Sequence, residues 1–243
     1  MANKKRLDIL VHERFSQYSR RQIQSWIMQG KVFVDERVVT KAGTQVADNV
    51  QVELKVDKPK YVGRAGFKLE KALDHFAVDI RDLVVLDAGL STGGFTDCLL
   101  QRGVKKVYGI DVGYGQVHEK IRNDTRVVVM ERTNLRFLRD IGELVDLVTL
   151  DLSFISIAKV MDAVCSVLKP DGQLITLIKP QFEAEKKDVG RGGIIKDSSI
   201  HKKVVDRVTK EIGKRGFQLV GVVDSPITGA SGNKEFLAYF KRL

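Results

Sequence analysis

The sequence predicts a doubly wound α/β domain with a smaller α+β domain in front of it. An apolar run rich in β-branched residues at 83–87 leads through a glycine-rich turn into a helix-like segment that starts near Phe95. Strand-like and helix-like segments then alternate through most of the remaining chain. Before them, short helices and strands end at a polar, proline-containing stretch, 57–60. We therefore expect one domain at 1–60 and a second at 61–243.

The smaller domain is expected to contain two short helices followed by short strands. Leu7, Leu10 and Phe15 are spaced to share one apolar helix face. Ser19 is a suitable N-cap for the second helix, and Gly30 is suited to end it. Apolar and alternating segments predict strands at 31–34, 37–39 and 50–56.

The larger domain is expected to hold a mostly parallel sheet with an antiparallel C-terminal edge. Amphipathic or apolar patterns predict helices at 67–76, 95–102, 116–123, 157–168 and 199–215. Apolar runs between them predict strands at 83–87, 107–111, 127–130, 145–150 and 174–178. The last two strand-like segments, 217–223 and 236–241, have no helix between them. Strands joined by helices pair in parallel, whereas directly joined strands pair antiparallel, which places the antiparallel pairing at the C-terminal edge.

The charge of the chain favours a polyanionic partner. The formal net charge is +10, and residues 1–60 hold 12 Lys and Arg against 7 Asp and Glu. Such a balance is typical of proteins that bind nucleic acid, although a generally basic protein would show it as well. No apolar run in the chain approaches the length of about 18 residues that a membrane span needs. We therefore expect a cytoplasmic protein without a membrane partner.

Cysteine and histidine usage argues against a disulfide or metal site. The two cysteines, Cys98 and Cys165, lie in apolar helix-like segments and are expected to be buried free thiols. The four histidines are scattered along the chain, and no His/Cys cluster has metal-ligand spacing. The sequence therefore predicts no metal site.

The glycine-rich turn reads Gly-Leu-Ser-Thr-Gly-Gly from residue 89 to residue 94. It matches neither the dinucleotide fingerprint nor a P-loop, so a pyrophosphate ligand is disfavoured. S-adenosylmethionine has an adenosine and a charged amino-acid part without a pyrophosphate. Its ammonium group would suit the carboxylate of Asp87, and its carboxylate would suit the backbone amides of the turn. A turn of this kind also occurs as a purely structural feature of α/β proteins.

Further polar residues follow the other strands of the predicted sheet, at the edge where α/β proteins bind ligands. Asp111 is placed to accept hydrogen bonds from ribose hydroxyls, and the stretch 131–134 is placed to hold an adenine edge. Asp151 and Lys179 end neighbouring apolar strands, where a lone charge is costly, and we expect them to pair. The residues expected to hold the cofactor are Asp87, Gly89, Ser91, Gly93, Gly94, Phe95, Asp111, Asn134 and Asp151.

The smaller domain resembles the S4 RNA-binding module. The resemblance rests on the helix at 19–27, which begins Ser-Arg-Arg-Gln, and on Gly-Lys-Val-Phe-Val-Asp at 30–35. It implies that the basic face of the second helix meets RNA phosphates, with Arg20, Arg21 and Lys31 at the matching positions. Without the resemblance, these charges are equally consistent with a solvated helix face.

The larger domain resembles the FtsJ-type 2′-O-ribose methyltransferases, and the whole chain resembles the TlyA family, also labelled hemolysin A. The motifs are Gly-Phe-Lys-Leu-Glu, Asp-Leu-Ser-Phe, Ile-Lys-Pro-Gln-Phe-Glu and Gly-Asn-Lys-Glu-Phe. They place the family's catalytic Lys-Asp-Lys-Glu tetrad on Lys68, Asp151, Lys179 and Glu235. The family pattern before the first lysine is Ser-Arg-Gly-Gly or Ser-Arg-Gly-Ala, whereas this chain has Gly-Arg-Ala-Gly at 63–66.

The resemblance implies methylation of a cytidine 2′-hydroxyl in ribosomal RNA with S-adenosylmethionine. Lys179 is then the base or alkoxide stabiliser, and Lys68 tunes it and holds the substrate. Asp151 orients Lys179, and Glu235 binds the ribose or Lys68. Arg64 is expected to contact an RNA phosphate, with a structural role equally open. The partners are ribosomal RNA and ribosomal subunits, and the family suggests a monomer or weak dimer.

Three alternatives remain open at the level of the sequence. The hemolysin label suggests a membrane-lytic protein, but no long basic amphipathic helix supports it. A non-catalytic RNA-binding or assembly factor would not need the intact tetrad. A methyltransferase acting on a small molecule would not need the basic N-terminal domain.

Overall fold

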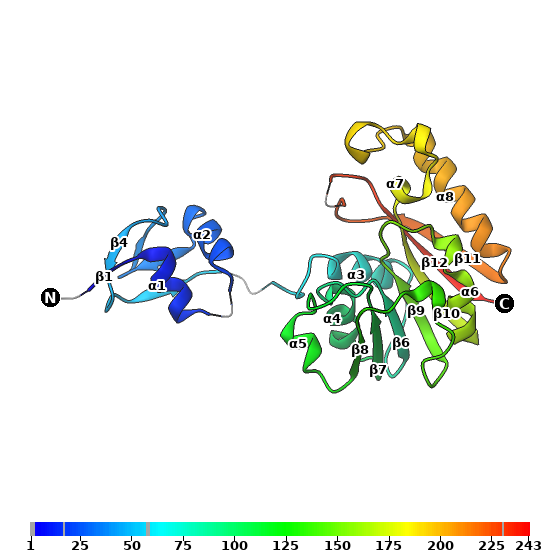
Figure 1. Ribbon diagram of the computed structural model, residues 1–243, viewed down its shortest axis with the longest axis horizontal. Helices are drawn as coiled ribbons and strands as arrows, with labels where there is room; N and C mark the ends of the chain where they lie inside the picture. Colours follow the sequence, from blue (N-terminus) through cyan, green and yellow to red (C-terminus); the bar gives the residue numbers. More distant parts are fainter. Residues whose placement is uncertain (1–2, 17, 57–58, 230) are drawn as a thin grey trace. The chain divides into compact units, whose positions relative to one another are not determined.

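A computed structural model describes residues 3–16, 18–56, 59–229 and 231–243. The chain divides into two compact units, Met1–Lys60 and Tyr61–Leu243 (Figure 1). Each unit has a hydrophobic core of its own.

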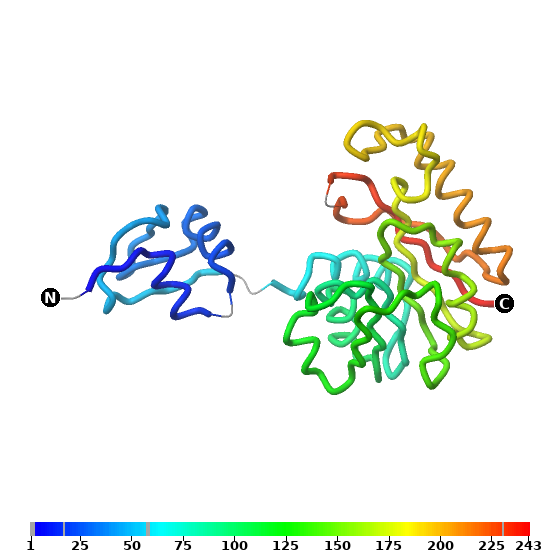
Figure 2. Tube along the Cα trace, viewed as in Figure 1, coloured from blue at the N-terminus to red at the C-terminus, as the bar shows by residue number. Residues whose placement is uncertain are grey.

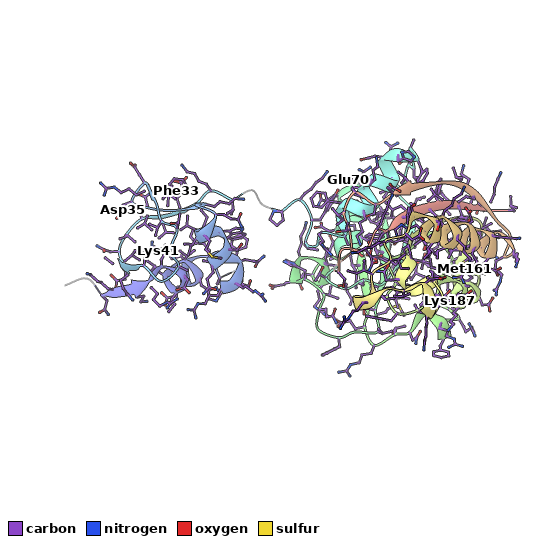
Figure 3. All side chains as sticks on the ribbon, turned by 90° about the horizontal axis from the view of Figure 1, so that it is seen from above. Phe33, Asp35, Lys41, Glu70, Met161 and Lys187 are labelled. Carbon is purple, nitrogen blue, oxygen red and sulfur yellow. The ribbon has the colours of Figure 1, made fainter. Side chains whose placement is uncertain are left out.

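The smaller unit packs two helices against short strands. Its elements are β1 (Lys4–Arg6), α1 (Leu7–Arg14), α2 (Arg20–Met28), β2 (Val32–Val34), β3 (Arg37–Val38), β4 (Gln45–Ala47) and β5 (Val52–Leu54). The strands form a three-stranded sheet, β3-β2-β5, and a separate pair, β1-β4. The ammonium of Lys55 lies over the ring of Phe33 on β2, 4.3 Å from the ring centroid; Phe33 is labelled in Figure 3.

The predicted cap of α2 is present in the structure. The Ser19 hydroxyl accepts a hydrogen bond from the Gln22 N–H, and the Gln22 side chain accepts one from the Ser19 N–H, so the two form a capping box. Ile23 and Ile27 are fully buried against Leu7 of α1. The β1-β4 pair was not predicted, because Lys4-Lys5-Arg6 lacks the apolar alternation that marks a strand.

The larger unit is built on a seven-stranded sheet in the order β11-β12-β10-β9-β6-β7-β8. Its strands are β6 (Val84–Ala88), β7 (Lys106–Ile110), β8 (Val127–Met130), β9 (Val145–Leu150), β10 (Leu168–Ile178), β11 (Phe217–Asp224) and β12 (Phe236–Arg242). β12 pairs antiparallel with both β10 and β11, while the remaining pairs are parallel. The C-terminal strand therefore runs back into the sheet, as the red end of the trace in Figure 2 shows. The prediction of a mostly parallel sheet with an antiparallel C-terminal edge is confirmed.

Helices cover both faces of this sheet, as a doubly wound fold requires. The elements between the strands are α3 (Gly66–His75), α4 (Gly94–Gln101), α5 (Glu119–Arg122), η1 (Leu135–Phe137), η2 (Ile157–Lys159), α6 (Met161–Val167), α7 (Pro180–Glu183), η3 (Lys186–Asp188), η4 (Arg191–Gly193) and α8 (Ser198–Gly213). Core residues of α3, α4 and α5 pack on one face, and those of α6 and α8 on the other. Val85 and Leu86, adjacent on β6, belong to the two different cores.

Some predicted helix boundaries differ from the structure. The segment predicted as one helix at 157–168 divides at Val160 into η2 and α6. α5 is shorter than predicted because His118, in extended conformation, caps it by accepting the Lys120 N–H. Cys98 is buried as expected, whereas Cys165 is only partly buried. Neither of these two cysteines forms a disulfide.

Candidate active site

A cavity of about 480 Å³ opens at the carboxyl-terminal edge of β6, β7 and β9 in the larger unit. Five of the residues predicted to hold a cofactor line it: Gly89, Ser91, Asp111, Asn134 and Asp151. They come from the loops that follow four different strands. The parallel register brings these loops together, because Ala88 at the end of β6 pairs with both Ile110 and Leu150.

Two glycines of the turn are required by its geometry. Gly89 has a φ of +89°, and a Cβ atom there would lie 2.4 Å from the carbonyl oxygen of Asp151. Gly93 is the N-cap of α4 with a φ of 96°, and a Cβ atom there would lie 2.7 Å from Cγ1 of Ile121. Any larger residue would strain the backbone and push on these neighbours. The turn therefore lies directly against the strand end that carries Asp151.

The carboxylate of Asp111 shapes the wall of the cavity. Its Oδ2 accepts a hydrogen bond of 2.7 Å from the Ser91 N–H, and its Oδ1 accepts one of 2.7 Å from the Gly113 N–H. Each carboxylate oxygen can accept a further hydrogen bond. Asp111 therefore fixes the glycine turn and keeps acceptor capacity for a hydroxyl donor.

Four predicted cofactor residues lie outside the cavity lining: Asp87, Gly93, Gly94 and Phe95. Asp87 is fully buried and accepts hydrogen bonds from the hydroxyls of Thr96 (2.6 Å) and Thr149 (2.8 Å). Burial raises the pKa of Asp87 to about 6, against the opposing effect of the two threonine bonds. The expected contact of Asp87 with the ammonium group of a cofactor stays a prediction. Asp87 instead joins β6, β9 and α4 beneath the turn.

The predicted pairing of Asp151 with Lys179 is present. The ammonium of Lys179 lies 2.6 Å from Oδ1 of Asp151 and donates a hydrogen bond of 3.0 Å to Oγ of Ser153. Both side chains are almost buried, at 12% and 10% exposure. The Lys179 ammonium is thus the ion-pair partner of the buried Oδ1 of Asp151, although their geometry is not that of a regular hydrogen bond. A carboxylate oxygen has two lone pairs, so this oxygen can accept a hydrogen bond in addition.

A second ion pair joins the other two tetrad residues. The Lys68 ammonium, on α3, donates a hydrogen bond of 2.6 Å to Oε2 of Glu235, and both side chains are buried. Glu235 immediately precedes Phe236, which pairs with Ile178, and Lys179 immediately follows Ile178. Continuing this antiparallel register places Lys179 opposite Glu235. Three of the predicted tetrad residues, Asp151, Lys179 and Glu235, therefore lie at adjoining strand ends. The fourth, Lys68 on α3, contacts Glu235 despite the unusual Gly-Arg-Ala-Gly stretch before it.

Two supporting residues were not predicted from the sequence. Glu183 is buried, and its carboxylate accepts hydrogen bonds from the Ser156 hydroxyl (2.8 Å) and the Ile157 N–H (2.7 Å). Burial raises the pKa of Glu183. Phe154, which has a φ of 64° and is 90% exposed, packs its ring 4.8 Å from that of Phe182. Both unpredicted positions lie within the Asp-Leu-Ser-Phe and Ile-Lys-Pro-Gln-Phe-Glu stretches, where the residue pattern does not indicate which side chains besides Asp151 and Lys179 are buried or exposed.

The predicted RNA-binding residues are exposed to different degrees. Arg21 and Arg64 are exposed and Lys31 is partly exposed. Arg20 is half exposed and donates to Oδ2 of Asp8 at 2.9 Å, while Arg6 donates to the same carboxylate at 3.0 Å. Burial acts to raise the pKa of Asp8, but the bonds from Arg6, Gln24 and Arg20 outweigh it and hold that pKa well below its ordinary value. The fully buried Asp8 was not predicted, because a single acid before an apolar run gives no signal.

Within the described residues, no helix has the length and apolarity to cross a membrane. The same part of the chain contains no group of three or more His, Cys, Asp or Glu side chains arranged for a metal ion.

Comparison with protein families gives two matches that follow the division of the chain. A model for the S4 domain matches residues 5–52, and a model for the FtsJ-like methyltransferase matches residues 61–242. This chain belongs to the FtsJ-like methyltransferase family. Together with the strand order, this membership confirms the predicted class I methyltransferase fold preceded by an S4 domain.

Relatives of this FtsJ-like protein share both domains. The 16S/23S rRNA (cytidine-2′-O)-methyltransferase TlyA of Mycobacterium tuberculosis is 41% identical, covering 99% of this chain and 91% of its own. Hemolysin A of Brachyspira hyodysenteriae is 43% identical, covering 97% of this chain and 99% of its own. A solved structure of a hemolysin-labelled protein from Streptococcus thermophilus has a TM-score of 0.76 and 39% identity, over 100% of this chain and 90% of that one. The chain thus belongs with the TlyA-type members that carry an S4 domain.

Proposed function

We propose that this protein transfers a methyl group from S-adenosylmethionine to the 2′-hydroxyl of a cytidine in ribosomal RNA. The observation that carries the proposal is the two buried ion pairs, Lys179–Asp151 and Lys68–Glu235. Asp151 lines the cavity, and the strand register places Lys179 opposite Glu235. A purely structural role would not require four charges in so small a volume, because buried ion pairs contribute little net stability. The name of the M. tuberculosis relative supports the same reaction.

The residues around the cavity fit the proposed cofactor. Asp111 retains acceptor capacity for ribose hydroxyls, and Oδ1 of Asp151 can accept a hydrogen bond in addition to its ion pair with Lys179. The amide side chain of Asn134 is placed in the wall, and the close approach at Gly89 leaves backbone rather than side chain against the ligand space. Bound S-adenosylmethionine supplies an electrophilic methyl group on its sulfonium. Gly93, Gly94, Phe95 and Asp87 are proposed to hold the turn in shape.

The tetrad residues then act on the ribose hydroxyl. We assign Lys179 to take the hydroxyl proton as the neutral amine, which becomes the ammonium, or to stabilise the alkoxide as the ammonium after the proton has left to water. Asp151 and Ser153 orient its Nζ atom for either role. Glu235 and Lys68 are assigned to hold the ribose, because their ion pair lies at the neighbouring strand end. Fixing the hydroxyl oxygen and its proton acceptor in one geometry supplies much of the rate enhancement for a displacement of this kind.

The two domains are proposed to have different functions, RNA binding and catalysis. Residues 1–60 form the RNA-binding domain, with Arg20, Arg21 and Lys31 as phosphate contacts, and residues 61–243 form the catalytic domain. Arg64 is proposed as a further phosphate contact because it is exposed at the start of α3. A substrate of this kind places the protein in the cytoplasm with the ribosomal subunits, acting without a metal ion as a monomer or weak dimer.

The test of the reaction is the variant Lys179→Ala. We expect methyl transfer to ribosomal RNA to fall by about 10²- to 10⁴-fold, as for loss of a positioned proton acceptor, while cofactor affinity stays within about twofold. Transfer is measured with radiolabelled S-adenosylmethionine, and cofactor binding by calorimetry.

The control is Lys187→Ala, which removes an exposed lysine from η3. Full methyl transfer by Lys179→Ala would contradict the assignment. Absence of transfer by the unchanged protein, with intact RNA binding, would favour a non-catalytic assembly factor instead. The same preparation is expected to leave liposomes intact, and their lysis would support the hemolysin alternative.

A further inference from the structure

A basic groove lies on the larger domain next to the catalytic cavity. It has a volume of about 420 Å³ and is formed by η1, the segment that follows it, η2, the start of α6 and the end of α8. The side chains that define it are Arg136, Phe137, Arg139, Lys159, Asp162 and Arg215. All six are exposed to solvent.

The charge of this basic groove is only slightly neutralised within the protein. Arg215 forms an ion pair with Asp162, which is the one acid in the lining. Among the residues that the structure describes, Arg136, Arg139 and Lys159 form no ion pair. Some other exposed arginines of this domain are paired, for example Arg81 with Asp79 and Arg122 with Glu131. Three unpaired cations around one groove favour an anionic ligand.

The basic groove also exposes an aromatic ring. The side chain of Phe137 is 68% exposed, and the Arg136 guanidinium lies 5.7 Å from its ring centroid. Single exposed apolar side chains are common, and Phe154 and Tyr114 are exposed as well, so it is the cations around Phe137 that distinguish this ring. Cations beside an exposed ring are the combination that binds a nucleic acid strand, since the cations contact phosphates and the ring stacks on a base.

The basic groove adjoins the catalytic cavity through shared elements. Leu135 of η1 and Val160, which ends η2, line the cavity. Their chain neighbours Arg136 and Lys159 line the groove. Adjacent residues of the chain therefore line the cavity and the groove, so an RNA strand bound in the groove would lie next to the cavity.

We propose that the basic groove binds the sugar-phosphate backbone of the RNA substrate, as a contact surface separate from the S4 domain. Arg136, Arg139 and Lys159 contact phosphates, and Phe137 stacks on a base. Arginine is well suited to this because its planar guanidinium donates two parallel hydrogen bonds to a phosphate. The proposal rests on the proposed function, since it takes RNA as the substrate.

An RNA partner is favoured over an acidic protein by the composition of the basic groove. An interface with a folded protein would bury an apolar centre, whereas this groove has a single exposed ring among cations. Phosphate contacts do not need such a centre, and their strength depends on salt.

The test is the double variant Arg139→Gln with Lys159→Gln in the full-length protein. Its matched control is Arg81→Gln with Lys105→Gln, which removes one exposed arginine and one exposed lysine near the amino-terminal ends of β6 and β7. The probe is a fluorescein-labelled single-stranded RNA of mixed sequence and about 30 nucleotides. Affinity is measured by fluorescence anisotropy over a series of KCl concentrations.

We expect the groove variant to lose about tenfold in affinity near physiological salt, and the slope of log affinity against log salt to fall by about 1.4, or 0.7 for each lost contact. The control should keep the affinity of the unchanged protein within about twofold. Arg139→Lys with Lys159→Arg should restore binding, because the charge remains. Phe137→Ala should weaken binding without altering the salt slope.

Equal affinities and slopes for the groove variant and its control would overturn the proposal. If the groove variant then failed to sediment with ribosomal subunits, the basic groove would belong to a ribosomal protein instead. Methyl transfer by the unchanged protein is measured in parallel. Absence of methyl transfer by the unchanged protein would contradict the proposed function. The anisotropy measurement would still show, independently, whether the basic groove binds RNA.

Discussion

The carboxylate of Asp87 supports the cofactor turn from beneath. It accepts hydrogen bonds from Thr96 on α4 and Thr149 on β9, so it ties together the elements on either side of the turn. A fully buried carboxylate is costly in its charged form. Asp87 therefore contributes geometry to the site and makes the stability of the domain depend on pH.

The variant Asp87→Asn is expected to change this pH dependence. With a pKa of about 6 in the folded protein and 3.8 in the unfolded chain, the carboxyl holds its proton more tightly when folded. Its contribution to stability is full below about pH 4 and is lost as the pH rises through 6. The loss is about 3 kcal/mol, from roughly two pKa units at 1.36 kcal/mol each.

Urea unfolding of both proteins between pH 4 and pH 7.5 measures this effect. The difference between the free energies of unfolding of the unchanged protein and Asp87→Asn should move by about 3 kcal/mol in favour of the variant over that range. Parallel pH profiles would show that Asp87 does not titrate there.

At this scale, charged residues in motifs were easier to predict than their surroundings. Lys179 and Asp151 were expected to pair because each ends an apolar strand, and they do. The burial of the Asp87 side chain could not be predicted from its place at the end of a strand, because the last side chain of a strand can point toward the ligand or into the core. Phe154 was missed because its exposure depends on a positive φ that no residue pattern indicates.

The glycine turn is the element that brings the cofactor side of the site against the tetrad. At Gly89 the backbone passes so close to Asp151 that no side chain fits between them. The turn then enters α4 through Gly93, which lies against Ile121 of α5. The contact between the loop after β6 and the loop after β9 therefore sets the width of the cavity.

The variant Gly89→Ala should weaken cofactor binding. The added Cβ would lie 2.4 Å from the Asp151 carbonyl oxygen, so the turn or the strand end must move. We expect the affinity for S-adenosylmethionine to fall on the order of tenfold or more, because shifts of about 1 Å at such a site are costly. The measurement is calorimetric titration.

Gly142→Ala is the matched control for this substitution. Gly142 has nearly the same φ, +90°, but a Cβ atom there would meet no atom within 4 Å. It carries the same backbone strain, about 1 to 2 kcal/mol, without the contact. Equal losses of cofactor affinity in the two variants would contradict the role given to the turn.

The corner between α1 and α2 depends on Asp8 in a similar way. Its buried carboxylate receives hydrogen bonds from Arg6, Arg20 and Gln24, and so fixes two arginines that remain half exposed. This arrangement orients both guanidinium groups on one side of the S4 domain. Arg20, which is proposed as a phosphate contact, thus depends on Asp8 for its orientation.

The variant Asp8→Asn should destabilise the S4 domain by about 1 to 3 kcal/mol, because charge-assisted hydrogen bonds are lost. The lowered pKa of Asp8 means that its contribution is present above the ordinary pKa of an aspartate and is lost as the pH falls below it. Asp79→Asn, which removes the acid of the exposed Arg81 pair, is the control. Thermal unfolding at pH 7 and pH 3 measures both, and a similar effect of the two variants would refute the role of Asp8.

Elements with strong periodicity were predicted well, and those defined by tertiary contacts were not. α8 and the edge strands β11 and β12 agree with prediction to within about two residues. The strand β1 forms only because β4 pairs with it, and its sequence is wholly charged. The division of 157–168 at Val160 follows from packing between η2 and α8, which periodicity alone does not record.

At the scale of the whole molecule, the protein combines an RNA-binding domain with a methyltransferase domain in one chain. The fold of the larger unit could be predicted from the order of the segments, because an α-helix or a short 3-10 helix lies between consecutive strands except the last two. The tetrad could be placed only through four motifs far apart in the sequence, which the antiparallel return of β12 brings together. The basic groove was not predicted, since its cations come from elements separated by up to about 80 residues.

The tetrad that contains Lys179 is proposed to catalyse methylation of a ribose hydroxyl in ribosomal RNA. The most direct measurement maps 2′-O-methyl groups in ribosomal RNA from cells that lack the gene, complemented with the unchanged protein or with Lys179→Ala. We expect the ribosomal RNA to contain at least one 2′-O-methylcytidine when the unchanged protein is present, and to lack it with Lys179→Ala. Identical maps for the two complemented strains would contradict it.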